Sequence, residues 1–137
     1  MTAKEKAARD YLDQARHIDL RIEARIDERD RLMARLTGGT KELTGMPRGG
    51  GHDWTDDAIK HVEACAERIS AEIVALCAAK EAVWAAIDSV EGLTLRTVLE
   101  MRYRAYRTWE DIAEELGYEV RYVKKLHLKA LNHVRVR

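Results

Sequence analysis

The stretch TWEDIAEELGYEVRYVKKLHLKAL, residues 108–131, decides the fold of the C-terminal part of this chain. Thr108 is a residue type that caps helices, and the apolar residues behind it recur with a helical period. Ala113 is small enough for two helices to cross closely, Gly117 allows a sharp corner, and Val123 can pack a second helix back against the first. A small residue, a turn glycine and a β-branched residue at these offsets are typical of a helix-turn-helix.

A further short helix precedes this pair. Apolar residues at helical spacing mark it, namely Leu95, Val98, Leu99 and Tyr103. The last helix of the chain is expected over about residues 120–133, with Val123, Leu126 and Leu131 facing inward. Residues 92–137 are therefore predicted to form a three-helix unit.

Residues 55–90 have the most regular periodicity in the chain. The pattern steps by three and four over about five heptads, as in a coiled-coil seam, through Ile59, Val62, Ala66, Ile69, Ile73, Leu76, Lys80, Val83, Ile87 and Val90. Lys80 is the single polar residue of this seam, and such a residue can select register or partner at a small cost in stability. Thr55 or Asp53 can cap the helix, and Asp56 and Asp57 suit its first turn.

The first long helix covers about residues 4–36. Its apolar stripe consists of Tyr11, Ala15, Ile18, Ile22, Ile26, Met33 and Leu36. Residues 38–54 are rich in glycine and are interpreted as a flexible loop, because their spacing fits no nucleotide-binding fingerprint. Two long helices joined by such a loop most simply form an antiparallel hairpin, and dimerisation through the same stripe is the competing use.

The fold class that follows is all-α. It combines a coiled-coil-like hairpin, made of residues 1–37 and 55–91 and joined by residues 38–54, with a C-terminal helix-turn-helix unit of residues 92–137.

Charge divides the chain at the same boundary. The whole sequence has 24 Lys and Arg and 24 Asp and Glu, so it carries no net charge. Residues 93–137 contain ten Lys and Arg against six Asp and Glu, a net charge of +4, and the first 92 residues, with 14 against 18, carry −4. Six of the ten cations follow Gly117. Positive charge concentrated on and after the second helix of the pair indicates a phosphate-binding surface.

Double-stranded DNA is therefore the expected partner. In a helix-turn-helix, the first residues of the second helix contact base edges and cations further along contact phosphates. We predict base contacts for Arg121, Tyr122 and Lys125. We predict backbone contacts for Lys124, Lys129 and Arg107. Trp109, the first residue of its helix, is expected either to pack inside the unit or to lie against the DNA backbone.

Three segments resemble region four of the sigma-70 class of RNA polymerase sigma factors. They are LRTVLEMRY at residues 95–103, TWEDIAEELG at 108–117 and VKKLHLKAL at 123–131. The resemblance as a whole covers about a third of the chain. This resemblance implies a helix-turn-helix that reads promoter DNA. The full layout also resembles small phage and prophage regulators of the RinA and ArpU groups, which are regarded as sigma-region-four-like activators of phage genes. Nothing resembles sigma region two, so we expect a regulator that uses its long helices to dimerise or to contact RNA polymerase.

Two other classes stay open. A phage packaging protein of the small-terminase kind also joins a helix-turn-helix to oligomerising helices, and a coiled-coil interaction protein would have no DNA partner. An enzyme is not expected, because the chain has no nucleophile motif and no paired carboxylates in a pocket pattern, and no cofactor is implied. His61 and Cys65 stand four apart on one helical face, but two ligands do not make a metal site.

Composition also bears on location. No apolar run approaches the ~20 residues that span a bilayer, and the charged N-terminus lacks the apolar core of a signal peptide. The two cysteines, Cys65 and Cys77, are too far apart on one helix to bridge each other. We therefore expect no membrane segment and a location in the cytoplasm of a bacterial host cell.

Overall fold

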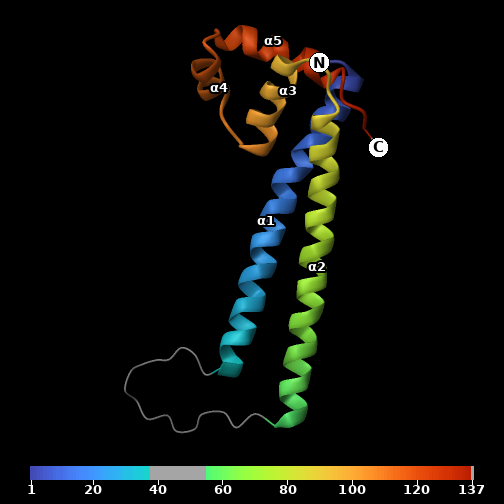
Figure 1. The fold of residues 1–137 in the computed structure, drawn as a ribbon, viewed down its shortest axis with the longest axis vertical. Helices are drawn as coiled ribbons and strands as arrows, with labels where there is room; N and C mark the ends of the chain where they lie inside the picture. Colours follow the sequence, from blue (N-terminus) through green and yellow to red (C-terminus); the bar gives the residue numbers. More distant parts are fainter. Residues whose placement is uncertain (38–54, 137) are drawn as a thin grey trace. The chain divides into compact units, whose positions relative to one another are not determined.

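The computed structural model of the chain describes residues 1–37 and 55–136. Its helices are α1 (Ala3–Thr37), α2 (Asp56–Asp88), α3 (Leu93–Leu99), the π-helical turn η1 (Glu100–Arg104), α4 (Trp109–Leu116) and α5 (Val120–Leu131) (Figure 1). No strand occurs among the described residues, so the predicted all-α class is confirmed. The predicted glycine-rich loop, residues 38–54, and with it the alternative cap Asp53, lie outside the described residues.

The described helices divide into two compact units. The first unit comprises Met1–Asp19 and Ala78–Arg137, and the second comprises Leu20–Cys77. Each unit therefore contains a part of both long helices. The helices of the C-terminal part share their compact unit with the end of α2 and with the beginning of α1, which lies far away in the sequence.

In the second unit α1 and α2 lie side by side (Figure 1). Ile22 of α1 and Ile69 of α2 are 8% and 7% exposed, and Arg29 of α1 donates a hydrogen bond to Oγ of Ser70 of α2 over 3.2 Å. Thr55 caps α2 as predicted, because its hydroxyl oxygen accepts a hydrogen bond from the backbone N–H of Ala58 at 3.1 Å.

One member of the predicted α1 stripe is wrong. Met33 is 38% exposed, whereas Leu32 and Leu36 are half-buried. Leu36 follows Leu32 by four residues, about one helical turn, so these two side chains lie on the same side of α1. The stripe therefore continues through Leu32 rather than Met33.

The core of the first unit is built from α1, α2, α3, η1, α5 and the segment after α5. Its largest fully buried side chains include Leu12, Ile87, Leu99 and Leu131, each 0% exposed. Leu12 occupies the core position on α1, and Tyr11, which was expected there, packs half-buried against the edge of the cluster. Val134, three residues beyond Leu131, the last residue of the predicted inward stripe, is also buried.

The predicted seam of α2 is covered within the single chain. None of its ten residues is exposed. Lys80, the polar member, donates a hydrogen bond from Nζ to Oδ1 of Asp19 on α1 over 2.6 Å, and its Nζ lies 4.5 Å from the ring centroid of Trp84. Both partners belong to the same chain and the same unit, so the polar residue of the seam is paired with α1 within the first unit.

Candidate nucleic-acid interface

The helix-turn-helix is built by local hydrogen bonds at both ends of α4. Thr108 begins the helix, because its hydroxyl oxygen accepts a hydrogen bond from the backbone N–H of Asp111 at 3.1 Å. Gly117 ends it in the left-handed conformation, with φ of 76°, and its N–H donates to the carbonyl of Ala113 at 2.9 Å. The N–H of Tyr118 donates to the same carbonyl at 3.0 Å. These bonds define the corner from which α5 starts.

The two helices pack through a small apolar cluster. Val98 of α3, Ile112 and Ala113 of α4, and Val123 of α5 are each at most 4% exposed and form one buried group. The predicted close crossing at Ala113 and the packed return at Val123 are therefore confirmed. The last helix ends at Leu131, two residues before the expected position.

A buried polar network of Tyr103, His127 and Trp109 joins α5 to η1 and α4. Oη of Tyr103 and Nε2 of His127 are 2.6 Å apart, and the His127 ring also meets the Trp109 ring at 4.6 Å between centroids. Burial, together with the positive charges of Arg102 and Arg9, lowers the pKa of His127 to about 4. Burial also raises the pKa of Tyr103. Both groups are therefore neutral at pH 7, and we assign the hydroxyl as the donor, since the neutral ring offers an acceptor nitrogen.

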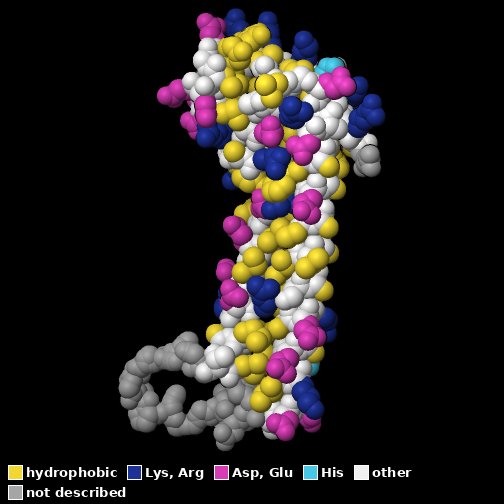
Figure 2. Space-filling model, in the orientation of Figure 1, with side chains coloured by type: hydrophobic (Ala, Val, Ile, Leu, Met, Phe, Trp, Pro, Cys, Tyr) yellow, Lys and Arg dark blue, Asp and Glu magenta, His cyan; other side chains and the backbone are white. Residues whose placement is uncertain are grey.

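Five of the predicted DNA contacts lie exposed on α5. They are Arg121, Tyr122, Lys124, Lys125 and Lys129. Arg121, Lys125 and Lys129 follow each other at intervals of four, so they form one row along the helix, opposite the side that carries Val123. Figure 2 shows Lys and Arg side chains over this helix. The structure therefore brings these five predicted contacts together on one exposed surface, which we call the α5 face.

The other two predicted contacts have partners inside the domain. Arg107 pairs with the carboxylate of Glu115. Trp109 is half-buried, with the guanidinium carbon of Arg102 lying 4.2 Å from its ring centroid and the His127 ring on another side. Of the two expectations for Trp109, this environment favours packing inside the unit.

The sequence analysis missed a contact that holds the end of α5. Thr2 and Glu5 form a capping box at the start of α1: Thr2 N–H donates to Glu5 Oε1 at 2.8 Å, and Glu5 N–H donates to Thr2 Oγ1 at 3.1 Å. The other carboxylate oxygen of Glu5 accepts a hydrogen bond from the side chain of Asn132 at 2.7 Å. The Thr-x-x-Glu spacing was the available signal for the cap, but nothing in the sequence pairs Glu5 with Asn132.

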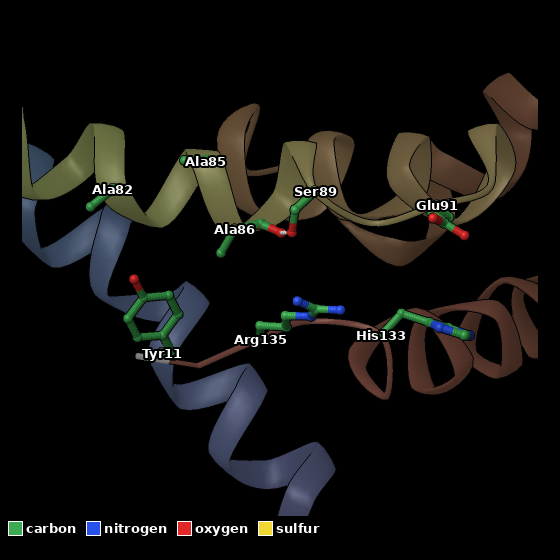
Figure 3. Close-up of a pocket in the computed structure, with 8 residues that line it drawn as sticks. All are labelled: Tyr11, Ala82, Ala85, Ala86, Ser89, Glu91, His133 and Arg135. Atoms are coloured by element: carbon green, nitrogen blue, oxygen red, sulfur yellow. Dashed lines mark hydrogen bonds between the residues drawn. The ribbon is translucent and has the colours of Figure 1, made fainter.

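One hollow of the first unit is a groove of about 610 Å³. Tyr11 comes from α1, the small side chains of Ala82, Ala85, Ala86 and Ser89 from the end of α2, and His133 and Arg135 from the segment after α5 (Figure 3). None of the seven predicted DNA contacts lines it. The groove is therefore separate from the α5 face.

The described chain offers little to a metal ion. Within residues 1–37 and 55–136, no three His, Cys, Asp or Glu side chains come together as ligands. His61 Nε2 and Cys65 Sγ are 3.8 Å apart, and Arg68 donates to that sulfur at 3.1 Å. None of the described helices is both long and apolar enough to cross a membrane.

The geometry of α4, the Gly117 corner and α5 is that of a helix-turn-helix. Comparison with known families agrees, because residues 94–136 match the family described as sigma-70, region 4. The match indicates that the C-terminal part is a helix-turn-helix DNA-binding module of the sigma-70 region 4-like type. Comparisons of the chain with curated proteins and with solved structures gave no match.

Proposed function

We propose that this protein is a sequence-specific transcription regulator of the phage or prophage type, which binds promoter DNA through its helix-turn-helix and acts in the cytoplasm of a bacterial host. The observation that carries the proposal is the α5 face, where four cations stand exposed on the second helix of a sigma-70 region 4-like module. The first 92 residues carry net negative charge, so this face is the local attraction for phosphates.

The contacts divide by their position on α5. Arg121 and Tyr122 lie in the first turn of α5, where recognition helices meet base edges, and Lys125 follows Arg121 one turn later. Lys124 and Lys129 contact the phosphate backbone. Arg107 is a weaker backbone contact, because a phosphate has to compete with Glu115 for its guanidinium.

The long helices supply the second part of the function, which is dimerisation or contact with RNA polymerase. The seam of α2 is already covered by the same chain, so another molecule has to use an outer face of these helices. In the second unit, the apolar side chains of Leu20 and Val74 are 55% and 69% exposed, so burying either of them in such a contact would remove apolar area from water.

The test is a salt titration of DNA binding. Lys124→Ala combined with Lys125→Ala is expected to weaken binding to any duplex DNA, and to reduce the slope of log affinity against log salt by up to about 2, since each phosphate contact contributes about 0.9. Lys6→Ala combined with Lys60→Ala removes the same charge from exposed positions on the long helices and is expected to change neither. Equal affinity and slope for the α5 variant and the wild type would overturn the proposal.

The fragments that the protein selects from genomic DNA distinguish a regulator from a packaging protein. A regulator enriches promoter regions, and a small-terminase-like protein enriches a packaging site. Fluorescence anisotropy on the enriched fragments then gives the specificity ratio over random duplex.

A further inference from the structure

An aromatic pair stands exposed at the start of α5. Tyr118 follows the Gly117 corner, and Tyr122 lies in the first turn of the helix. The two residues are 41% and 48% exposed. Their ring centroids are 5.0 Å apart with the planes at 82°, an edge-to-face arrangement. The other Tyr and Trp residues within the described ranges are buried or half-buried. An exposed aromatic pair on a highly charged chain therefore indicates a contact surface for a partner molecule.

Backbone hydrogen bonds hold the chain that carries both rings. The N–H of Tyr118 donates to the carbonyl of Ala113 at 3.0 Å, beside the bond from Gly117. Tyr122 is followed in the helix by Val123, which is 0% exposed. The N–H of Val123 donates a hydrogen bond to the carbonyl of Glu119 at 3.0 Å. A surface that is ordered before binding loses little conformational freedom when a ligand covers it.

Tyr122 is part of the α5 face, and the ring of Tyr118 lies against it. Tyr122, Lys125 and Lys129 follow at steps of three and four, so their side chains leave the helix in the same direction. In Figure 2 apolar side chains appear next to Lys and Arg side chains over the start of α5. An apolar surface bordered by cations fits a polymer that presents apolar groups between rows of phosphates.

Duplex DNA presents one such apolar group in its major groove. The 5-methyl group of thymine distinguishes A·T from the other base pairs there, and apolar side chains are its usual contact. We propose that the rings of Tyr118 and Tyr122 form a contact surface for thymine methyl groups, and so make the protein select thymine at the positions next to the start of α5. This inference rests on the proposed function and names the base feature that the interface reads.

The experiment replaces thymine by deoxyuridine, which pairs identically and lacks only the methyl group. A binding site is first selected from random duplex DNA with the wild-type protein, and each thymine is then exchanged in turn. Burial of one methyl contributes about 0.8 kcal/mol, which corresponds to about a fourfold change in affinity. Wild-type protein is expected to bind about fourfold more weakly for each contacted methyl that is removed.

Protein variants assign the effect to the rings. Tyr118→Ala combined with Tyr122→Ala is expected to bind thymine and deoxyuridine sites equally. The Phe variants at both positions are expected to keep the preference, because they lose only the hydroxyl groups. Leu93→Ala serves as the matched control, since Leu93 is 72% exposed in the same unit and lies outside the α5 face. Circular dichroism confirms that each variant is folded.

Three results would overturn the inference in different ways. If the wild type binds its selected site but no exchange to deoxyuridine matters, the methyl contact is refuted while the proposed function stands. If the Ala variant keeps the full preference, other residues read the methyl groups. If no DNA is enriched and no salt-dependent binding is found, the proposed function itself fails and the inference fails with it.

Discussion

The carboxylate of Asp19 joins three parts of the first unit, so its removal is the sharpest test of how that unit holds together. Oδ1 accepts the hydrogen bond from Lys80 on α2, and Oδ2 accepts one from the hydroxyl of Tyr106, in the loop before α4. Burial by itself raises the pKa of Asp19, but the hydrogen bonds from Lys80 and Tyr106 outweigh this effect, so that the pKa lies below its ordinary value. The carboxylate is therefore charged and paired at neutral pH.

The cost of Asp19→Ala follows from the exposure of the pair. Breaking a fully buried ion pair costs about 3 to 5 kcal/mol, and an exposed pair contributes about 0 to 1 kcal/mol. The side chains of Lys80 and Asp19 are 18% and 27% exposed, between these limits. We expect a loss of about 2 kcal/mol in the free energy of unfolding. For a chain of this size, the melting temperature should fall by roughly 6 to 8 °C.

Urea unfolding followed by circular dichroism at pH 7 measures this loss. Asp10→Ala on the same helix is the matched control, because Asp10 pairs with Arg9 at 3.4 Å and its side chain is 58% exposed. Its expected effect is below about 0.5 kcal/mol. A double-mutant cycle of Asp19→Ala with Lys80→Met should give a coupling energy above about 1 kcal/mol. The reasoning is refuted if Asp19→Ala and Asp10→Ala cost the same, or if the coupling is zero.

Three further perturbations test other parts of the fold. The pKa of His127 is about 4 in the folded state and about 6.5 in the unfolded state, so the unfolded state binds more protons between these pH values. The free energy of unfolding should therefore be full above pH 6.5 and lower by about 2 kcal/mol at pH 5. When unfolding is measured at both pH values, this loss should disappear in His127→Gln and persist in His17→Gln. Gly117→Ala should cost about 1 kcal/mol in urea unfolding, because φ is 76° while nothing lies within 4 Å of an added Cβ, and an equal stability of the variant would show that the corner is not left-handed in solution. Ile69→Asp should destabilise the second unit by about 3 kcal/mol and reduce its helical signal in circular dichroism. Val74→Asp, at a position that is 69% exposed on the same helix, should have neither effect. Equal behaviour of the two variants would contradict the burial of this face of α2.

Periodicity predicted the elements of this fold because their signals are local. The seam of α2 has no exposed member, and Thr55, Thr108 and Gly117 end or begin helices where expected. A cap or a turn depends on neighbours within a few residues, so a single sequence contains the needed information. The weaker α1 stripe was less well predicted, since Tyr11 and Leu12 are both apolar and neighbouring residues on a helix compete for one core position.

The candidate interface could be predicted only in part. Exposure of Arg121, Lys125 and Lys129 follows from the inward position of Val123 on the same helix. The pairing of Arg107 with Glu115 could not be foreseen, because it depends on how the loop before α4 folds back. For the same reason, the sequence did not reveal that Tyr118 and Tyr122 form one aromatic pair, since their contact depends on the geometry of the Gly117 corner.

By itself, the sequence determined the all-α class, the long helices, the helix-turn-helix and the concentration of positive charge after Gly117, because all of these depend on residue type and short spacing. Tertiary structure decided which distant groups meet. It gave Lys80 its partner in Asp19, placed the carboxylate of Glu5 beside Asn132, and buried His127 between Tyr103 and Trp109. The physical reason is that a polar group in a partly buried site needs a partner, and the chain path alone decides which partner is within reach.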